Sequence, residues 1–401
     1  MKHTKRRPAS RLLAVLLGIA AALLILEVAI RVLYPSLPSG LQIALRFVRR
    51  TPFTDVRLAP LPIFREDSEF GMITEPDLRD VEQIGSTDVR YKVDTYSWWG
   101  GRTGFRTPPP SDGNVQAVAI GDSHTFCFTA YADCWVKLLS DKIGIPISNL
   151  GQIAVGAESH ARRYEAFVSR PELKLVQPKL VIWQFYGNDF NDDYGLALLN
   201  GSNATPPDTD PFTGQNEQSV PWLTENSALY VLIRALSTSP RDQGQLFVDP
   251  YRAAKDGVEI SFGRRYTVSA NDMSRAINQE GERHTYAAII RAKQIIEANG
   301  GKFVVILMPE KEMIYRNLIA PILEETIGSQ TLEKIDEPRR RMLAFCAESN
   351  LTCLDLLPAL TARADTGVQL LYPDDIHLNA EGNRAVAEIV AAFLRDQAVW
   401  P

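Results

Sequence analysis

The sequence contains few of the residues on which metal and redox enzymes depend. Its 401 residues include five histidines and four cysteines, and these form no group with metal-ligand spacing. No C-x-x-C motif occurs, which argues against a zinc ribbon or a dithiol redox site. A glycine-rich loop of the kind that holds phosphates is also missing. We therefore expect a protein that uses neither a metal ion nor a cofactor.

Acidic residues are missing from the N-terminal tail but are abundant elsewhere. Residues 1–11 carry five basic side chains and no acid, whereas the chain beyond residue 33 has 37 basic and 47 acidic residues, a net charge of about −10. An acidic surface repels the phosphates of DNA and RNA. We expect no nucleic-acid partner, and the sequence identifies no protein partner.

One long apolar segment follows the basic tail. Residues 12–30, LLAVLLGIAAALLILEVAI, would span about 28 Å as a helix, close to the roughly 30 Å hydrocarbon core of a membrane. The basic flank favours a cytoplasmic tail at 1–11 and a single transmembrane anchor at 12–33 of a bacterial inner membrane, with the remaining chain in the periplasm. A cleaved signal peptide is the alternative, although its apolar core is usually shorter and ends at a small-residue cleavage site.

The four cysteines form two pairs with the same spacing. Six residues separate Cys127 from Cys134, and six separate Cys346 from Cys353. Outside the cytoplasm this spacing favours two local disulfides, with four buried thiols as the alternative.

Beyond residue 113, short apolar runs alternate with helical patterns. The runs are continuous in apolarity, which is typical of parallel strands covered on both faces. For residues 114–401 we predict a three-layer α/β/α sandwich with a mostly five-stranded parallel sheet. The predicted strands are residues 115–120, 146–150, 180–185, 302–308 and 351–356.

Two segments fall outside this alternation. Residues 34–113 contain prolines, turns and short strand-like pieces, and we interpret them as a linker and N-terminal extension. Residues 190 to about 275 are polar and rich in turns, with one short amphipathic helix in SALYVLIRAL. We interpret this part as an insertion near the strand ends, where substrate-facing loops lie, or as a surface loop without a role.

Chemically useful residues follow the apolar runs, at the strand ends where parallel sheets bind ligands. VAIGDSHTFC places Ser123 after the first run, NLG places Gly151 after the second, and YGND places Asn188 after the third. The stretch YPDDIHLN, before the last helix, supplies Asp374 and His377. The topology therefore predicts one site at this edge of the sheet.

A serine hydroxyl becomes a nucleophile when a neighbouring base takes its proton, and His377 is the candidate base for Ser123. Asp374 is the candidate carboxylate that orients this imidazole, with the adjacent Asp375 as the alternative. A structural role for Ser123 as a helix N-cap is the other interpretation.

Ester attack also creates an oxyanion, which needs donors already in place. The candidate donors are the backbone N–H groups of Ser123 and Gly151 and the side-chain amide of Asn188. Asn188 could instead only bridge its own turn.

The motifs GDSH, NLG, GND and DDIH resemble, in order, the four conserved blocks of the SGNH (GDSL-type) hydrolases, over roughly residues 114–397. The resemblance implies an SGNH, flavodoxin-like fold with a serine nucleophile. RVLYP after the apolar segment, GGRTGFR before the first strand and MPEKEMIY after the fourth are similar to the membrane-anchored bacterial branch. No G-x-S-x-G motif occurs, which argues against the ordinary α/β-hydrolase elbow.

Two residues depart from the family pattern. His124 stands where relatives usually have an apolar residue, and we expect a partly exposed histidine there, with a contact to substrate or Asp189 as the alternative. Cys127 stands where glycine is common, which suggests that its bond to Cys134 fixes the loop after the nucleophile. We expect His160, in a polar helical stretch, to be solvated.

The predicted function is an extracytoplasmic serine esterase that acts through a covalent acyl-enzyme on acylated, for example acetylated, glycans or lipids. With the same residues the protein could be an O-acyltransferase that modifies an exported polysaccharide. A non-catalytic glycan-binding protein of the envelope is the third hypothesis.

Overall fold

The structure is a computed structural model that describes residues 8–37, 45, 63–86, 89–98, 101–111, 113–168, 178–201, 223, 226–237, 250–263, 267, 270–317, 329–373 and 375–399. The chain divides into two units. The larger unit consists of Pro62–Gly214 and Val248–Pro401, and the smaller unit consists of Met1–Leu61 and Gln215–Phe247.

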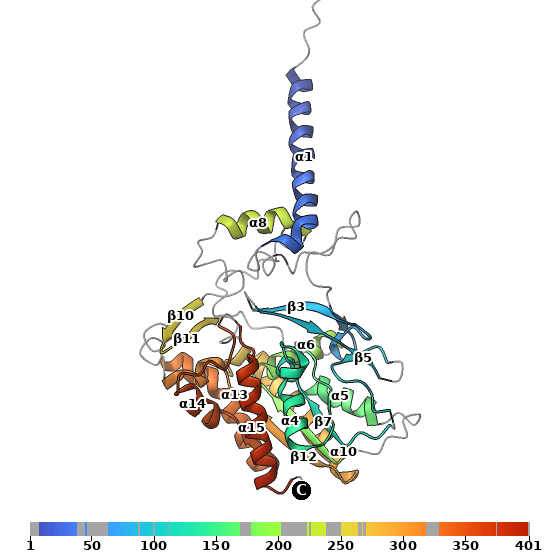
Figure 1. Cartoon of the computed structure of the whole chain (residues 1–401), viewed down its shortest axis with the longest axis vertical. Helices are drawn as coiled ribbons and strands as arrows, with labels where there is room; N and C mark the ends of the chain where they lie inside the picture. Colours follow the sequence, from blue (N-terminus) through green and yellow to red (C-terminus); the bar gives the residue numbers. More distant parts are fainter. Residues whose placement is uncertain are drawn as a thin grey trace, which may run out of the picture. The chain divides into compact units, whose positions relative to one another are not determined.

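A five-stranded parallel sheet in the order β13-β12-β9-β7-β8 forms the centre of the larger unit (Figure 1). All five predicted strands are present, and the predicted parallel pairing is confirmed. The strands are β7 (Ala117–Ile120), β8 (Ile147–Asn149), β9 (Leu180–Phe185), β12 (Lys302–Leu307) and β13 (Thr352–Asp355).

Strand side chains enter two separate cores because successive residues point to opposite faces of a sheet. In β7, Ala117 and Ala119 belong to one core, whereas Val118 and Ile120 belong to the other. Helices α4 (Trp135–Ile143), α14 (Leu357–Ala364) and α15 (Ala380–Asp396) contribute to the first core. Helices α5 (Ala157–Val168), α10 (Ala276–Ala298) and α13 (Ser329–Glu348) contribute to the second. The predicted α/β/α sandwich is therefore confirmed.

The expectation for His160 is wrong. This residue of α5 is fully buried, with its ring 5.3 Å from that of Trp183 in β9. The polar residues around His160 predict a solvated helix, but this face of α5 lies against the sheet.

Residues of the N-terminal extension pack as small antiparallel pieces within the larger unit. Gln152, just after β8, accepts a hydrogen bond from the Thr74 N–H (2.7 Å) and donates one to the Gly104 carbonyl (3.0 Å). The part of the extension from Pro62 onward therefore belongs to the same unit as the sheet, whereas residues 34–61 belong to the smaller unit. Its strands are β1 (Phe64–Asp67), β2 (Gly71–Thr74), β3 (Val81–Ser86), β4 (Val89–Val93), β5 (Tyr96–Ser97) and β6 (Gly104–Phe105).

Both predicted disulfides are present, and the pairing is confirmed. The Cα atoms of Cys127 and Cys134 are 5.6 Å apart, and those of Cys346 and Cys353 are 6.3 Å apart. Cys127 has a φ of 66°, a left-handed conformation that glycine adopts more readily.

The interval 190–275 contributes to both units. Helix α6 (Asp189–Leu199) packs on α10, and strands β10 (Pro250–Lys255) and β11 (Val258–Gly263) form a hairpin in the larger unit. Helix α8 (Ala228–Ser237) belongs to the smaller unit with α1 (Pro8–Leu33) and the 3-10 turn η1 (Tyr34–Ser36). The remaining short helices, all in the larger unit, are α3 (Ser123–Phe126), η2 (Tyr131–Asp133) and α11 (Lys311–Ile314).

Candidate active site

The turn after β7 presents Ser123 at the first position of a short helix. Asp122 is the N-cap of α3, and its carboxylate accepts a hydrogen bond from the His124 N–H at 2.8 Å. A Cβ at Gly121 would lie 2.4 Å from Thr125 Oγ1 and 2.5 Å from Gln184 Oε1. Glycine is therefore required before the aspartate, and the turn brings the serine directly to the end of the strand.

Ser123 and His377 meet although 254 positions separate them. The Ser123 Oγ atom lies 2.8 Å from Nε2 of His377, and Nδ1 of the same ring lies 2.6 Å from Oδ1 of Asp375. The histidine and aspartate side chains are only 13% and 24% exposed. Asp374, the predicted orienting residue, lies outside the described residues. The carboxylate in contact with His377 is that of Asp375, the alternative that the sequence leaves open.

A buried lysine holds the loop that carries this pair. Lys311, the first residue of α11, donates from Nζ to the carbonyls of Tyr372 (3.1 Å), Pro373 (3.0 Å) and Asp375 (2.7 Å). Hydrogen bonds from a charged donor are stronger than those from a neutral donor. Lys311 of the MPEKEMIY motif thus fixes the backbone that carries His377 and Asp375.

The loop after α3 covers the other side of the imidazole. The ring centroid of Phe128 lies 4.2 Å from that of His377, and the Tyr372 hydroxyl donates to the Phe128 carbonyl at 3.0 Å. Arg106, from GGRTGFR, donates to the carbonyls of Phe126 (3.0 Å), Cys127 (2.8 Å) and Thr129 (3.1 Å). A guanidinium of the extension therefore fixes the loop that contacts the candidate base.

His124 is buried, so the expectation of a partly exposed side chain is wrong. Its ring centroid lies 4.5 Å from that of Tyr186 and 5.1 Å from that of His377. Burial lowers the pKa of His124 well below its usual range, and the neighbouring His377 lowers it further. The Tyr186 hydroxyl in turn donates to the buried carboxyl of Glu310. A neutral imidazole, rather than a charged one, therefore packs behind the candidate base.

Gly151 and Asn188 follow the two strands that pair with β7. A Cβ at Gly151 would lie 2.4 Å from the Phe126 nitrogen, so glycine allows the second block to pack against α3. Its N–H donates to Asn149 Oδ1 at 2.9 Å. Asn188, after β9, donates from Nδ2 to Asp192 Oδ2 at 3.2 Å. Both residues follow strands that pair with β7, and their role as oxyanion donors stays a prediction.

Carboxyl groups concentrate beneath this edge of the sheet. Burial raises the pKa of Asp122 to about 6 and that of Asp192 to about 7. Burial and the charge of Asp122 raise the pKa of Asp189 well above its ordinary value. Burial thus opposes ionisation of all three carboxyl groups. Among the described residues, no three His, Cys, Asp or Glu side chains form a group that could hold a metal ion.

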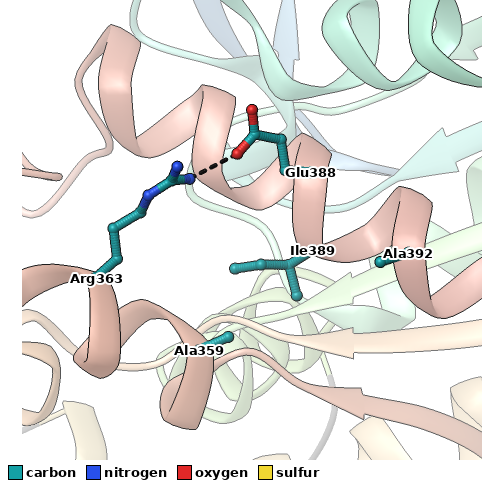
Figure 2. Close-up of a pocket in the computed structure, with 5 residues that line it drawn as sticks. All are labelled: Ala359, Arg363, Glu388, Ile389 and Ala392. Atoms are coloured by element: carbon teal, nitrogen blue, oxygen red, sulfur yellow. Dashed lines mark hydrogen bonds and ion pairs between the residues drawn. The ribbon is translucent and has the colours of Figure 1, made fainter.

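A separate surface pocket of about 350 Å³ lies between α14 and α15 (Figure 2). Arg363 and Glu388 form an ion pair of 2.7 Å at its edge, and the other lining residues are Ala359, Ile389 and Ala392. Ser123, His377 and Asp375 are not among the residues that line this pocket.

The sequence predicts Ser123, Gly151, Asn188 and His377 as site residues but not the residues that hold this part of the structure in place. These are Arg106, Phe128, Tyr186, Glu310 and Lys311. The GGRTGFR and MPEKEMIY motifs contain three of them, Arg106, Glu310 and Lys311, and were the available signal, but only the tertiary structure shows which atoms they contact.

Comparison with known proteins gives one family match, which covers the C-terminal part of the chain. Residues 266–385 match the GDSL-like Lipase/Acylhydrolase family. This segment contains Lys311, Asp375 and His377 but not Ser123. No curated protein sequence matches the chain.

Several solved structures resemble the chain weakly. A lipolytic G-D-S-L family protein from Veillonella parvula is 11% identical, with 69% of this chain and 97% of that chain covered and a TM-score of 0.35. A catalytic mutant of an acetylxylan esterase from Geobacillus stearothermophilus is 15% identical, with 70% and 93% covered and a TM-score of 0.34. An esterase from Pseudoalteromonas is 10% identical, with 71% and 98% covered and a TM-score of 0.33. Similarities at this level carry no argument about the reaction.

Proposed function

We propose that Ser123, His377 and Asp375 are the catalytic triad of an ester hydrolase, and the match of residues 266–385 to the GDSL-like Lipase/Acylhydrolase family supports this proposal. The observation that supports the proposal is the unbroken contact from Ser123 Oγ to His377 Nε2 (2.8 Å) and from Nδ1 to Asp375 (2.6 Å). The base thus lies within hydrogen-bond distance of both the nucleophile and the orienting carboxylate, as acyl transfer requires.

In the first half of the reaction, Ser123 Oγ attacks the ester carbonyl carbon while His377 Nε2 takes the hydroxyl proton. Asp375 accepts the Nδ1–H and stabilises the imidazolium that forms. The tetrahedral intermediate collapses as the C–O bond to the alcohol breaks, and the imidazolium gives its proton to the leaving oxygen. Water then attacks the acyl-enzyme with the same histidine as its base, which releases the acid and restores the serine.

The proposed oxyanion donors are the Ser123 N–H, the Gly151 N–H and the Asn188 amide. They follow three neighbouring strands of one sheet, β7, β8 and β9. In the conformation described, the donors of Gly151 and Asn188 bond to Asn149 and Asp192. Substrate must therefore take over or share these hydrogen bonds. One such donor typically contributes about 3 kcal/mol to transition-state stabilisation.

We also propose that α1 anchors the enzyme to the inner membrane with its catalytic unit outside the cytoplasm. The span Leu13–Leu33 is long and apolar enough to cross a bilayer, and 6% of it is buried by protein. The basic tail supports the orientation, and the two disulfides suit an oxidising compartment. Acylated glycans or lipids are the proposed substrates, since an enzyme held at that surface encounters esters of this kind.

The test is labelling of the full chain with a fluorophosphonate, followed by peptide mass spectrometry and turnover of p-nitrophenyl acetate. A single adduct on Ser123, lost together with turnover in Ser123→Ala, is the expected result. Ser140→Ala is the control, since within the described part of the chain this hydroxyl of α4 bonds to the carbonyl of Ile145 and to the N–H of Ile147. Turnover by Ser123→Ala, or an adduct on another residue, would refute the nucleophile. Product analysis with an added glycan acceptor separates hydrolysis from acyl transfer.

A further inference from the structure

The smaller unit contains an ion pair at the C-terminal end of the apolar helix. Glu27 and Arg31 of α1 contact each other at 2.6 Å, and their side chains are 16% and 1% exposed. Glu27 is the one acidic residue in the first 33 positions. At helical rise it lies about 9 Å from Leu33, the last residue of the span. A charged pair at this depth must find partners that offset its lost hydration.

The partners come from a segment 200 residues later. The Glu27 carboxylate accepts hydrogen bonds from the N–H groups of Ala228 (2.9 Å) and Leu229 (2.8 Å) and from the Ser227 hydroxyl (3.0 Å). Arg31 donates to the Asn226 carbonyl at 3.2 Å. Glu27 thus caps the N-terminus of α8, where a carboxylate is favoured both by unsatisfied N–H groups and by the helix dipole.

Apolar packing extends this contact. Ala228 and Val231, one helical turn apart, are buried in a cluster with Ile30 of α1 and Tyr34 of η1. Figure 1 shows α8 lying crosswise to α1 near its C-terminal end. Farther along α8, by contrast, the Ile233 side chain is 56% exposed. Helix α8 therefore has one face on α1 and an apolar residue outside that contact.

We propose that α8 is clamped to the end of an uncleaved α1 and lies there in the lipid interface, so that the chain contacts the bilayer through two segments. The proposal rests on the membrane anchor described under the proposed function. Lipid is the occupant that the structure favours, because α8 is joined to the end of a membrane-length helix whose own side chains, such as Leu24 (64%) and Ile25 (67%), are left uncovered by protein. An amphipathic helix at that position buries its apolar residues among headgroups and upper acyl chains.

The contacts also bear on processing of the N-terminus. Removal of α1 as a signal peptide would leave Ala228 and Leu229 without the carboxylate that accepts their N–H groups, and would uncover Val231. Since the first N–H groups of a helix have no acceptor within the helix, exchange at these two amides reports directly on the clamp.

The test uses the full chain in phosphatidylcholine nanodiscs that contain a phospholipid with a diazirine near its headgroup. Peptide mass spectrometry locates the lipid adducts, and hydrogen–deuterium exchange follows the amides of Ala228 and Leu229. We expect adducts on α1 and on the peptide that contains Ile233. Glu27→Leu should speed exchange at the two amides at least tenfold and reduce the α8 adducts severalfold. Glu27→Gln, which keeps a side-chain oxygen, should have a smaller effect.

Gly18→Leu is the matched control, because it also makes α1 more apolar but adds its side chain where nothing lies within 4 Å. It should change neither readout. Adducts on α1 without adducts on α8 would overturn the lipid contact alone, and equal exchange in Glu27→Leu and Gly18→Leu would overturn the clamp. If α1 itself stays unlabelled, the membrane anchor of the proposed function is wrong.

Discussion

The Nδ1 atom of His377 lies 2.6 Å from Oδ1 of Asp375, although the D-x-x-H pattern indicates Asp374 as its partner. The backbone N–H of His377 also donates to the same carboxylate oxygen, at 3.2 Å. One carboxylate thus holds both the ring and the main chain of the candidate base. The two neighbouring aspartates can be separated by experiment.

Asp375→Asn should lower kcat by about 10³- to 10⁴-fold, because an amide neither fixes the required tautomer nor stabilises the imidazolium. Asp374→Asn should lower kcat less than tenfold. Steady-state hydrolysis of p-nitrophenyl acetate by both variants measures the difference. The reverse order would return the orienting role to Asp374.

Asn188→Ala should lower kcat about a hundredfold or more with little change in KM, because an oxyanion donor acts mainly in the transition state. Asn191→Ala, on the same helix, is the control, since its amide bonds to Asn278. Kinetics with a short-chain aryl ester provide the measurement. A kcat equal to that of wild type would remove Asn188 from the oxyanion site.

Lys311→Met should remove three carbonyl contacts from the loop that carries Asp375 and His377. We expect kcat to fall 10- to 100-fold with KM within a few fold, since the ammonium positions the base without touching substrate. Lys311→Arg should restore part of the rate. Unfolding in urea should show a loss of about 2 kcal/mol, the usual effect of losing a charged donor. If kcat stays at the wild-type value while stability falls, the lysine has a structural role only.

The two disulfides allow a matched comparison, because each closes a loop of the same size. Replacing either pair with serines should cost about 2–3 kcal/mol of stability. Only Cys127→Ser with Cys134→Ser should also lower kcat, by about tenfold, since that bridge lies in the loop that places Phe128 on His377. The other pair joins α13 to β13. Equal kcat values for the two double variants would contradict this role.

The raised pKa of Asp122 predicts a pH dependence of stability. Its pKa is about 6 in the fold and about 4 in an unfolded chain, so the fold favours the protonated form. This contribution is complete below pH 4 and is lost as the pH rises through 6. Asp122→Asn cannot ionise and should gain about 3 kcal/mol relative to wild type between pH 4 and 7. Urea unfolding at several pH values tests this prediction. Asp396 is exposed, and Asp396→Asn should change the free energy of unfolding much less.

The sheet was predictable from the sequence because continuous apolar runs and helical periods are local patterns. That Ser123, Gly151 and Asn188, which follow neighbouring strands, lie at one edge of the sheet could be inferred from parallel topology alone. The choice between Asp374 and Asp375 could not be predicted from the sequence. The two side chains are identical, and only the course of the backbone decides which carboxylate reaches the imidazole. The contact between Glu27 and α8 could not be predicted either, because periodic patterns in a sequence report on neighbouring residues and not on segments 200 residues apart.

The hydrogen bonds that Arg106 donates to three carbonyls after the nucleophile have a practical consequence. The sequence places a domain boundary near residue 113, and a shortened protein that begins there would seem a natural choice for expression. Such a protein would retain every reacting group but would lose the guanidinium that shapes the loop carrying Phe128. Truncations intended to yield a working enzyme without its membrane helix should therefore start ahead of the first hairpin, before residue 63.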